Sequence, residues 1–179
     1  LDDKTIVRFG LGYAPNDGQA LYQYLRDKGY NQQELDASGL FKRSQSGRIY
    51  CLFWKRVMTP IFDLRGNIIA FGGRVMDDSK PKYVNSPETL VYHKSETVFA
   101  MQIAKRSASR RFVLCEGYMD VISMQQAGID TAVCACGTAL TPGQVRIISE
   151  YADEVILSYD SDEAGQKATL RSLELFRNS

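Results

Sequence analysis

The sequence predicts an α/β protein in two parts, a mixed α/β part over residues 1–107 and a parallel-sheet part over residues 108–179. Two observations support this prediction. From residue 111 onward, short apolar runs alternate with amphipathic helical patterns, and the connections between them are short. Such alternation is typical of a parallel sheet with right-handed crossovers. Before that point the elements are less regular, and the basic stretch over residues 105–111 has the composition of a linker.

In the first part the clearest element is a β-hairpin, because two apolar runs flank a turn in which Gly66 can take a positive φ. Asn31 and Glu34 have the spacing of a capping box, which predicts the start of a short helix. We interpret residues 42–55 as loop with a short strand, and the polar stretch 77–94 as a long ordered loop. The expected regular elements are a strand over 6–13, helices over 17–28, 31–39 and 95–106, and hairpin strands over 57–62 and 68–76.

The second part reads as three strands, each followed by a helix. Thr141 and Pro142 are an N-cap and a first-turn proline, which predicts where the middle helix begins. Ligands of such sheets bind at the carboxyl ends of the parallel strands. The expected strands cover 112–115, 131–136 and 155–159, and the expected helices cover 118–127, 141–151 and 164–176.

The composition is that of an ordinary globular protein, with 44% hydrophobic, 24% charged and 11% aromatic residues. These values exclude a disordered, collagenous or coiled-coil chain. The longest apolar runs, such as 67–73 and 155–159, are far shorter than the ~20 residues that a membrane-spanning helix needs, so no membrane partner is expected. No long exposed apolar face stands out, so we expect a monomer. The start Leu1-Asp2-Asp3-Lys4, without a Met or an apolar signal segment, predicts an excised fragment.

The four cysteines lack the C-x-x-C spacing of a zinc site, and His93 is the only histidine. Most of the cysteines lie in apolar strand-like runs, where a thiol behaves as a small hydrophobic group. We therefore expect cysteines in the core of a protein from a reducing cytosol, and no cysteine nucleophile.

Charge is distributed unevenly along the chain. Residues 1–110 carry 17 Lys and Arg and 11 Asp and Glu, a net charge of +6, whereas residues 111–179 carry 5 and 10, a net charge of −5. A basic half suits a polyanion such as nucleic acid, and an acidic half suits a divalent cation. The alternative is that two solvated surfaces of opposite sign dock on each other.

Acidic residues follow the first and third strands of the second part. Glu116 comes directly after the first strand and Asp120 lies about one helical turn further on, whereas Asp160 and Asp162 come directly after the third strand. Carboxylates that converge without basic residues between them repel one another unless a cation lies between them, and Mg²⁺ or Mn²⁺ prefers such oxygen ligands. The alternative is that Asp160 or Asp162 only caps the following helix, and that Glu116 is an exposed loop residue.

These residues carry a family resemblance. The motif Glu116-Gly-Tyr-Met-Asp120, followed by a strand that ends in Asp160-x-Asp162-x-Ala-Gly, resembles the toprim domain that primases, topoisomerases and some repair nucleases share. Further motifs resemble the polymerase core of bacterial replicative DNA primases: Phe71-Gly-Gly-Arg74, the run from Pro81 to Thr89, His93-Lys94, and Gly137-Thr138-Ala139-Leu140-Thr141. The resemblance covers nearly the whole chain.

The resemblance implies a mixed α/β N-terminal subdomain followed by a Rossmann-like parallel-sheet toprim domain. It implies a nucleotidyltransferase, a DNA-dependent RNA polymerase that makes short RNA primers on a single-stranded DNA template from nucleoside triphosphates, and so forms an RNA–DNA hybrid. Glu116, Asp160 and Asp162 would hold Mg²⁺ or Mn²⁺, with Asp120 alongside as a further catalytic residue. The implied location is the bacterial cytoplasm, at the replication fork.

The same resemblance assigns nucleotide and nucleic-acid binding to Arg74, Lys82, Asn85 and Lys94. The alternative for each basic residue is a solvated surface charge. Tyr83 is a candidate for stacking on bases. Phe53 and Trp54 are further candidates for stacking, but we predict that both belong to the core. Gly137 and Thr138 are expected to shape the site through close backbone approach.

The sequence also departs from the family pattern. Ser161 stands between the two aspartates where glycine is common. The family has a further acidic pair downstream, and the chain stops at Ser179 before reaching it, so we do not expect polymerase activity from this fragment alone. From the resemblance we also expect this fragment to lack the family's zinc-binding module and the module that docks on the replicative helicase.

Two other functions stay open. One is another toprim enzyme, a topoisomerase or a nuclease. The other is a catalytically silent nucleic-acid-binding module, for which loss of Glu116 or Asp160 would leave metal binding unaffected.

Overall fold

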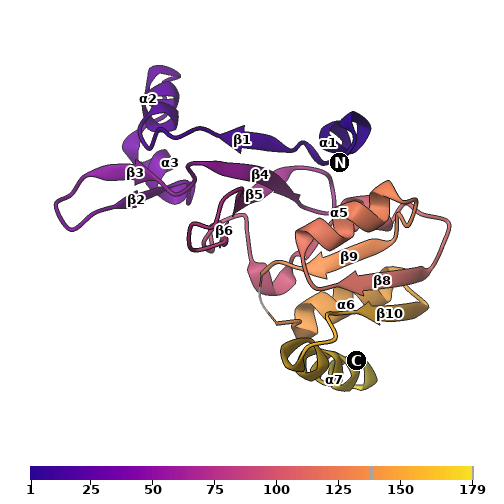
Figure 1. Ribbon diagram of the computed structural model, residues 1–179. Helices are drawn as coiled ribbons and strands as arrows, with labels where there is room; N and C mark the ends of the chain where they lie inside the picture. Colours follow the sequence, from indigo (N-terminus) through magenta and orange to yellow (C-terminus); the bar gives the residue numbers. More distant parts are fainter. Residues whose placement is uncertain (138, 179) are drawn as a thin grey trace. The chain divides into compact units, whose positions relative to one another are not determined.

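The structure is a computed structural model that describes residues 1–137 and 139–178. The chain forms two compact units (Figure 1). The N-terminal unit comprises Ile6–Pro60 and Ile69–Tyr92, and the C-terminal unit comprises Leu1–Thr5, Ile61–Ile68 and His93–Ser179. Within the described residues, no helix is both long and apolar enough to span a bilayer.

The C-terminal unit is built on a four-stranded sheet in the order β10-β8-β9-β7. Strands β8 (Arg111–Cys115), β9 (Ala132–Ala135) and β10 (Glu154–Ser158) are parallel, which confirms the predicted alternation of strand and helix. Strand β7 (Val98–Phe99) pairs antiparallel with β9, so the sheet is mostly parallel. The three helices that follow the parallel strands are α5 (Tyr118–Gln126), α6 (Pro142–Tyr151) and α7 (Glu163–Arg177).

Helices cover both faces of this sheet (Figure 1). On one face, the thiol of Cys115 in β8 lies 3.5 Å from the sulfur of Met124 in α5. On the other face, Phe112 and Leu114 of β8 pack with Ile148 of α6 in the main hydrophobic core, against which α7 also packs. Because side chains alternate along a strand, the apolar run of β8 supplies both faces.

The helix expected over 95–106 is wrong in its first half. This stretch contains a 3₁₀ turn (Lys94–Glu96), β7 and the short helix α4 (Met101–Ala104). The helix begins only after Ala100, whose φ of 62° interrupts the backbone. Gly143 of α6 approaches the turn so closely that a Cβ there would lie 2.7 Å from the carbonyl oxygen of Ser95. Tertiary packing therefore outweighs the local helical pattern.

The sheet of the N-terminal unit has the order β1-β4-β5-β6. The predicted hairpin is confirmed as β4 (Arg56–Phe62) and β5 (Ile68–Val75), with Gly66 at a φ of 93°. Strand β6 (Tyr83–Asn85) lies inside the stretch expected to be loop and pairs antiparallel with β5. The expected strand over 6–13 is wrong: it is replaced by α1 (Asp3–Phe9) and the short β1 (Gly12–Ala14), and the amide of Thr5 bonds the Asp2 carboxylate at 2.7 Å.

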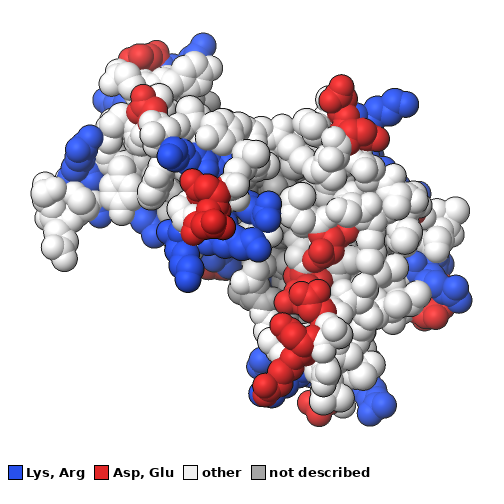
Figure 2. Space-filling model, in the orientation of Figure 1, with Lys and Arg blue, Asp and Glu red and all other residues white. Residues whose placement is uncertain are grey.

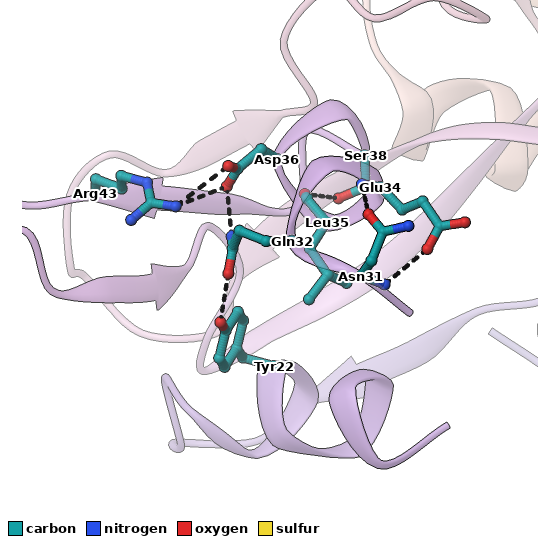
Figure 3. A network of polar contacts seen from close by, with 8 residues as sticks. All are labelled: Tyr22, Asn31, Gln32, Glu34, Leu35, Asp36, Ser38 and Arg43. Carbon is teal, nitrogen blue, oxygen red and sulfur yellow. Dashed lines mark hydrogen bonds and ion pairs between the residues drawn. The ribbon is translucent and has the colours of Figure 1, made fainter. Parts of the chain in front are cut away.

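A polar network joins the small elements of the N-terminal unit, helices α2 (Ala20–Asp27) and α3 (Gln32–Ala37) and the hairpin of β2 (Phe41–Arg43) and β3 (Ile49–Cys51). Figure 3 shows the predicted capping box of Asn31 and Glu34 at the start of α3. Tyr22 of α2 donates to Gln32, Gln32 donates to Asp36, and Asp36 pairs with Arg43 of β2 at 3.2 Å (Figure 3). These contacts hold the basic hairpin against the helices.

All four cysteines are buried thiols, which confirms their prediction as core residues. Phe53 is also in the core, in a cluster with Cys51 and Leu52. Trp54 is not: 43% of it is exposed, so its assignment to the core is wrong. Lys55, which follows Trp54, has a φ of 50°, so the chain turns directly after the exposed indole.

Candidate functional site

The carboxyl ends of β8, β9 and β10 meet at one edge of the C-terminal sheet, which we call the carboxyl edge. Glu116 follows β8 directly, and Asp160 lies two residues beyond β10. The amide of Asp160 donates to Oε2 of Glu116 at 3.1 Å. The two predicted residues are therefore neighbours, and both are exposed. Figure 2 shows acidic side chains gathered on this side of the unit.

Tight packing holds the backbone of Asp160. A Cβ at Gly165 would lie 2.0 Å from the carbonyl oxygen of Asp160, so only glycine fits where α7 passes this loop. Asp162 caps α7, since its Oδ1 accepts from the amide of Gly165 at 2.8 Å. The spacing from Asp160 to Gly165 follows from this geometry, because Asp162 caps the start of α7 and Gly165 permits the close approach of α7 to Asp160.

Asp120 has a similar local bond. It lies in the first turn of α5, and its Oδ2 accepts from the amide of Gly117 at 3.0 Å. Glu116, Asp120 and Asp162 therefore each accept a backbone amide through one carboxylate oxygen. In the part of the chain that the structure describes, no three acidic, His or Cys side chains lie close enough together to hold a metal ion.

The chemistry of these side chains suits Mg²⁺ or Mn²⁺, because all of them offer hard carboxylate oxygens. The observed arrangement, however, is one neighbouring pair, Glu116 and Asp160, with Asp120 and Asp162 occupied in helix capping. Their assignment as catalytic and metal-binding residues stays a prediction.

Lys94 lies at the same edge of the sheet, for a reason that the sequence did not reveal. Because β7 runs antiparallel to β9, its amino end lies beside the carboxyl end of β9, and Val98 pairs with Ala135. The completely buried Gln144 of α6 holds this segment by donating to the carbonyl oxygens of Lys94 at 2.8 Å and Thr97 at 2.9 Å. The compact unit thus groups Lys94 with the carboxylates rather than with Arg74 and Lys82.

The thiols beside this edge are unsuited to chemistry at neutral pH. Burial raises the pKa of Cys115 to about 12, and the nearby Asp120 carboxylate adds to this shift. Burial likewise raises the pKa of Cys134 well above its usual value. Both side chains stay protonated and behave as core groups, which agrees with the sequence prediction.

The N-terminal unit carries a separate basic cluster on β5 and β6. Arg74 pairs with Tyr83 in the strand register, and its guanidinium lies 5.8 Å from the centroid of the Tyr83 ring. The ammonium group of Lys82 lies 5.9 Å from the same centroid. Asn85 of β6 pairs with Gly72 of β5 in the strand register. Three of the four predicted binding residues, Arg74, Lys82 and Asn85, are therefore neighbours.

A pocket of about 370 Å³ adjoins this cluster and is lined by Arg74, Lys80 and Lys82 together with Asp77 and Asp78. In Figure 2 basic side chains surround a small acidic group on this unit, near β6. Two side-chain atoms here, Nε of Arg74 and Oδ1 of Asn85, are buried without a hydrogen-bond partner among the described residues.

Arg56 supports this cluster and was missed from the sequence. Only 4% of it is exposed, and its guanidinium donates to the carbonyl oxygens of Pro81 at 2.9 Å and of Gly73 and Lys82 at 3.3 Å. Gly73 leaves room for it, since a Cβ there would lie 3.0 Å from the Arg56 side chain. A basic residue opening an apolar strand was the only sequence signal.

Gly137 has a φ of 72°, which favours glycine, and Thr138 lies outside the described residues.

Comparison with known proteins identifies the family. The model of the DNA primase catalytic core, N-terminal domain, matches residues 1–105, and the Toprim-like model matches residues 113–179. The chain belongs to the DNA primase catalytic core family. The predicted fold, a mixed α/β subdomain followed by a toprim domain, is confirmed for this primase core.

A DNA primase of Clostridium acetobutylicum is 44% identical over 180 residues, which cover all of this chain and 30% of that protein. The Escherichia coli primase catalytic core superposes with a TM-score of 0.89 at 37% identity, covering 98% of this chain and 56% of that one. A DnaG primase catalytic domain bound to ssDNA superposes with a TM-score of 0.88, also at 37% identity, covering 98% and 57%. This primase chain therefore spans about a third of the curated relative and just over half of the solved cores.

Proposed function

We propose that the chain is part of a DNA primase that synthesises short RNA primers on single-stranded DNA. The supporting observation is the carboxyl edge of the C-terminal sheet, where Glu116 and Asp160 are neighbours and where the amino end of β7 places Lys94 at the same edge. This edge combines oxygen ligands for a cation with a positive charge for a triphosphate. Catalysis of nucleotidyl transfer requires both.

In this proposal Glu116, Asp160 and Asp162 bind Mg²⁺ or Mn²⁺, with Asp120 alongside. Bound divalent ions would supply activation of the attacking 3′-hydroxyl and charge compensation for the departing pyrophosphate. Lys94 would hold a phosphate group of the incoming nucleoside triphosphate as a mobile point charge. The packing of Gly165 against Asp160, and of Gln144 against Lys94, would keep these groups in place before substrate binds.

The basic cluster of the N-terminal unit would bind nucleic acid and nucleotide phosphates. Arg74 and Lys82 would contact phosphates, Asn85 would offer a polar contact, and Tyr83 would stack on a base. The proposed partners are the single-stranded template, nucleoside triphosphates and the RNA–DNA hybrid. We also propose that the primase acts as a monomer at the replication fork in the bacterial cytoplasm. Docking on the replicative helicase would be done by a part of the primase outside this chain.

The N-terminal family match favours this function over a topoisomerase or a nuclease, because it covers residues outside the toprim-like region. A catalytically silent binding module is the remaining alternative. It differs from the proposal in one measurable respect, since it requires no cation at the carboxyl edge.

Calorimetric titration with Mn²⁺, with and without a nucleoside triphosphate, tests the proposal. We expect saturable binding by the wild type, loss of that binding in Asp160→Asn, and wild-type binding in Glu150→Gln, a control carboxylate exposed on α6. Equal binding by wild type and Asp160→Asn would contradict the assignment of the site. Binding lost equally in Glu150→Gln would show that general surface charge is responsible.

A further inference from the structure

Trp54 is the only tryptophan of the chain, and the structure exposes its side chain next to the buried Phe53. Phe53 is 3% exposed, Trp54 is 43% exposed, and Arg56 is 4% exposed. The amide of Lys55 donates to the carbonyl oxygen of Pro15 at 3.2 Å, and the φ of Lys55 is 50°. The amide of Leu52 donates to the carbonyl oxygen of Leu40 at 2.7 Å, so the backbone is anchored on both sides of Trp54. Tryptophan is enriched at interfaces, because its ring combines a large apolar face with a polar N–H group.

The segment around Trp54 is strongly basic. Residues 37–62 contain five Lys and Arg and no Asp or Glu. Of these, Lys42, Arg48 and Lys55 are exposed, whereas Arg43 is engaged with Asp36 and Arg56 is buried. A run of this length with one sign of charge attracts a polyanion.

Trp54 also adjoins the basic cluster of β5 and β6. The charge of Lys55 contributes to lowering the pKa of Asp77, after the hydrogen bonds that Ser79 donates to that carboxylate. Lys55 therefore lies close to the pocket that Asp77 lines with Arg74 and Lys82. The guanidinium of Arg56 bonds the carbonyl oxygens of Pro81 and Lys82, next to Tyr83. Residues 54–56 and 74–83 are thus parts of one surface.

This surface presents two half-exposed aromatic rings, Trp54 at 43% and Tyr83 at 44%, among exposed cations. Unpaired bases stack on such rings, while Lys and Arg side chains bind the phosphates between them. A duplex keeps its bases stacked on one another and offers the rings only its backbone and groove edges. The combination therefore matches single-stranded nucleic acid.

We propose that Trp54 stacks on a base of the single-stranded DNA template and forms, with Tyr83, a two-ring platform on the basic surface of the N-terminal unit. This proposal rests on the proposed function, because it assigns to the template strand a contact beyond Arg74, Lys82, Asn85 and Tyr83. Lys55 contacts a neighbouring phosphate. Arg56 is a positioning residue that keeps the Tyr83 side of the platform beside Trp54.

The single tryptophan makes the test direct, because the intrinsic indole emission of the chain comes from Trp54 alone. The probe is an oligothymidylate of about 15 nucleotides, matched to the size of a strand-binding site. Binding is measured by anisotropy of a labelled strand, and stacking is measured by quenching of indole emission. An abasic phosphate chain of equal length is the control ligand, since it carries the charge without the bases.

We expect saturable quenching by oligothymidylate and little quenching by the abasic chain. Trp54→Leu should weaken binding of oligothymidylate roughly 5- to 100-fold, while Trp54→Phe should retain most of the affinity. The matched control is Tyr24→Leu on α2, an exposed ring with Lys28 5.5 Å away, which Figure 1 shows well apart from β6. This control should bind as the wild type does.

Binding of oligothymidylate without quenching, together with wild-type affinity in Trp54→Leu, would overturn the stacking role and leave the proposed function intact. Equal losses in Trp54→Leu and Tyr24→Leu would also overturn it, because the effect would then be general. No binding of oligothymidylate by the wild type at low salt would overturn both this proposal and the proposed template binding.

Discussion

Replacing Gly165 with alanine should destabilise the C-terminal unit and disturb the carboxyl edge together. The added Cβ would lie 2.0 Å from the carbonyl oxygen of Asp160 and 2.8 Å from its carbonyl carbon. Contacts below 3.0 Å are essentially never observed, so the Asp160 backbone must move by about 1 Å. The movement strains the bond of 3.1 Å between the Asp160 amide and Glu116.

Overpacking of this kind costs about 1–3 kcal/mol, or more where the contact is backbone rather than side chain. For a unit of this size, about 1 kcal/mol lowers the midpoint of thermal unfolding by about 4–8 °C. Differential scanning calorimetry of Gly165→Ala should therefore show a midpoint at least about 5 °C lower for the C-terminal unit. A Mn²⁺ titration of the same variant should show weaker binding, because Asp160 is displaced.

Gly12→Ala is the matched control, since a Cβ at that position meets nothing within 4 Å and the backbone there is not left-handed. Its midpoint should equal that of the wild type or rise slightly, as alanine restricts the unfolded chain. If Gly165→Ala unfolds at the wild-type temperature, the close approach of Gly165 to Asp160 does not exist in solution.

Arg56→Met should lower the free energy of unfolding by about 2–4 kcal/mol in urea denaturation, because three carbonyl groups lose a buried charged donor. A loss below about 0.5 kcal/mol would contradict the supporting role of Arg56 beneath β5 and β6. Gln144→Leu should lower the free energy of unfolding by about 1–3 kcal/mol, because the carbonyl oxygens of Lys94 and Thr97 lose their donor. It should also weaken nucleotide binding, measured by calorimetry. Unchanged nucleotide affinity would show that Gln144 does not position Lys94. Stability should fall as the pH rises from about 9 toward 12, because the folded pKa of the Cys115 thiol, about 12, lies above its unfolded value and the unfolded thiol ionises first. Denaturation of Cys115→Ala at each pH should show a smaller fall in stability over this range. An unchanged slope in Cys115→Ala would assign the pH dependence to other groups.

Much of the C-terminal unit was predictable because its signals are strong and local. Thr141 and Pro142 define the start of α6, and the apolar runs of the three strands are long enough to be recognised. Parallel pairing then dictates that Glu116 and Asp160 lie at one edge, and this edge is confirmed. A capping role was the open alternative for Asp160 or Asp162, and the bond to Gly165 shows Asp162 in that role. The similar bond from the Gly117 amide to Asp120 was not predicted.

The short strands were not predicted because they are too short to show a hydrophobic periodicity. Strand β6 has 3 residues and β7 has 2, so their existence depends on pairing with β5 and β9 rather than on their own sequence. The edge position of Lys94 follows from β7 and was missed for the same reason. The strand expected over 6–13 begins with the β-branched Ile6 and Val7, yet these two residues lie in α1, which begins next to Asp2.

Side-chain exposure was the least predictable property. Phe53 and Trp54 are adjacent aromatic residues in one basic stretch, and the sequence offered no reason to treat them differently. The structure buries Phe53 and exposes Trp54, and the chain turns directly after Trp54 at the left-handed Lys55, whose amide bonds Pro15. Similarly, Arg56 resembles a surface charge in the sequence, and only the carbonyl groups around it explain its burial.

In the proposed site, a divalent cation binds between Glu116 and Asp160 at the carboxyl edge of the C-terminal sheet. Paramagnetic broadening by Mn²⁺ in the amide spectrum of the ¹⁵N-labelled chain locates the bound cation. We expect substoichiometric Mn²⁺ to broaden first the amides of residues 116, 117 and 160, and we expect Mg²⁺ to reverse the broadening. Broadening centred instead on Asp77 and Asp78, or spread evenly over exposed carboxylates, would contradict the proposed site.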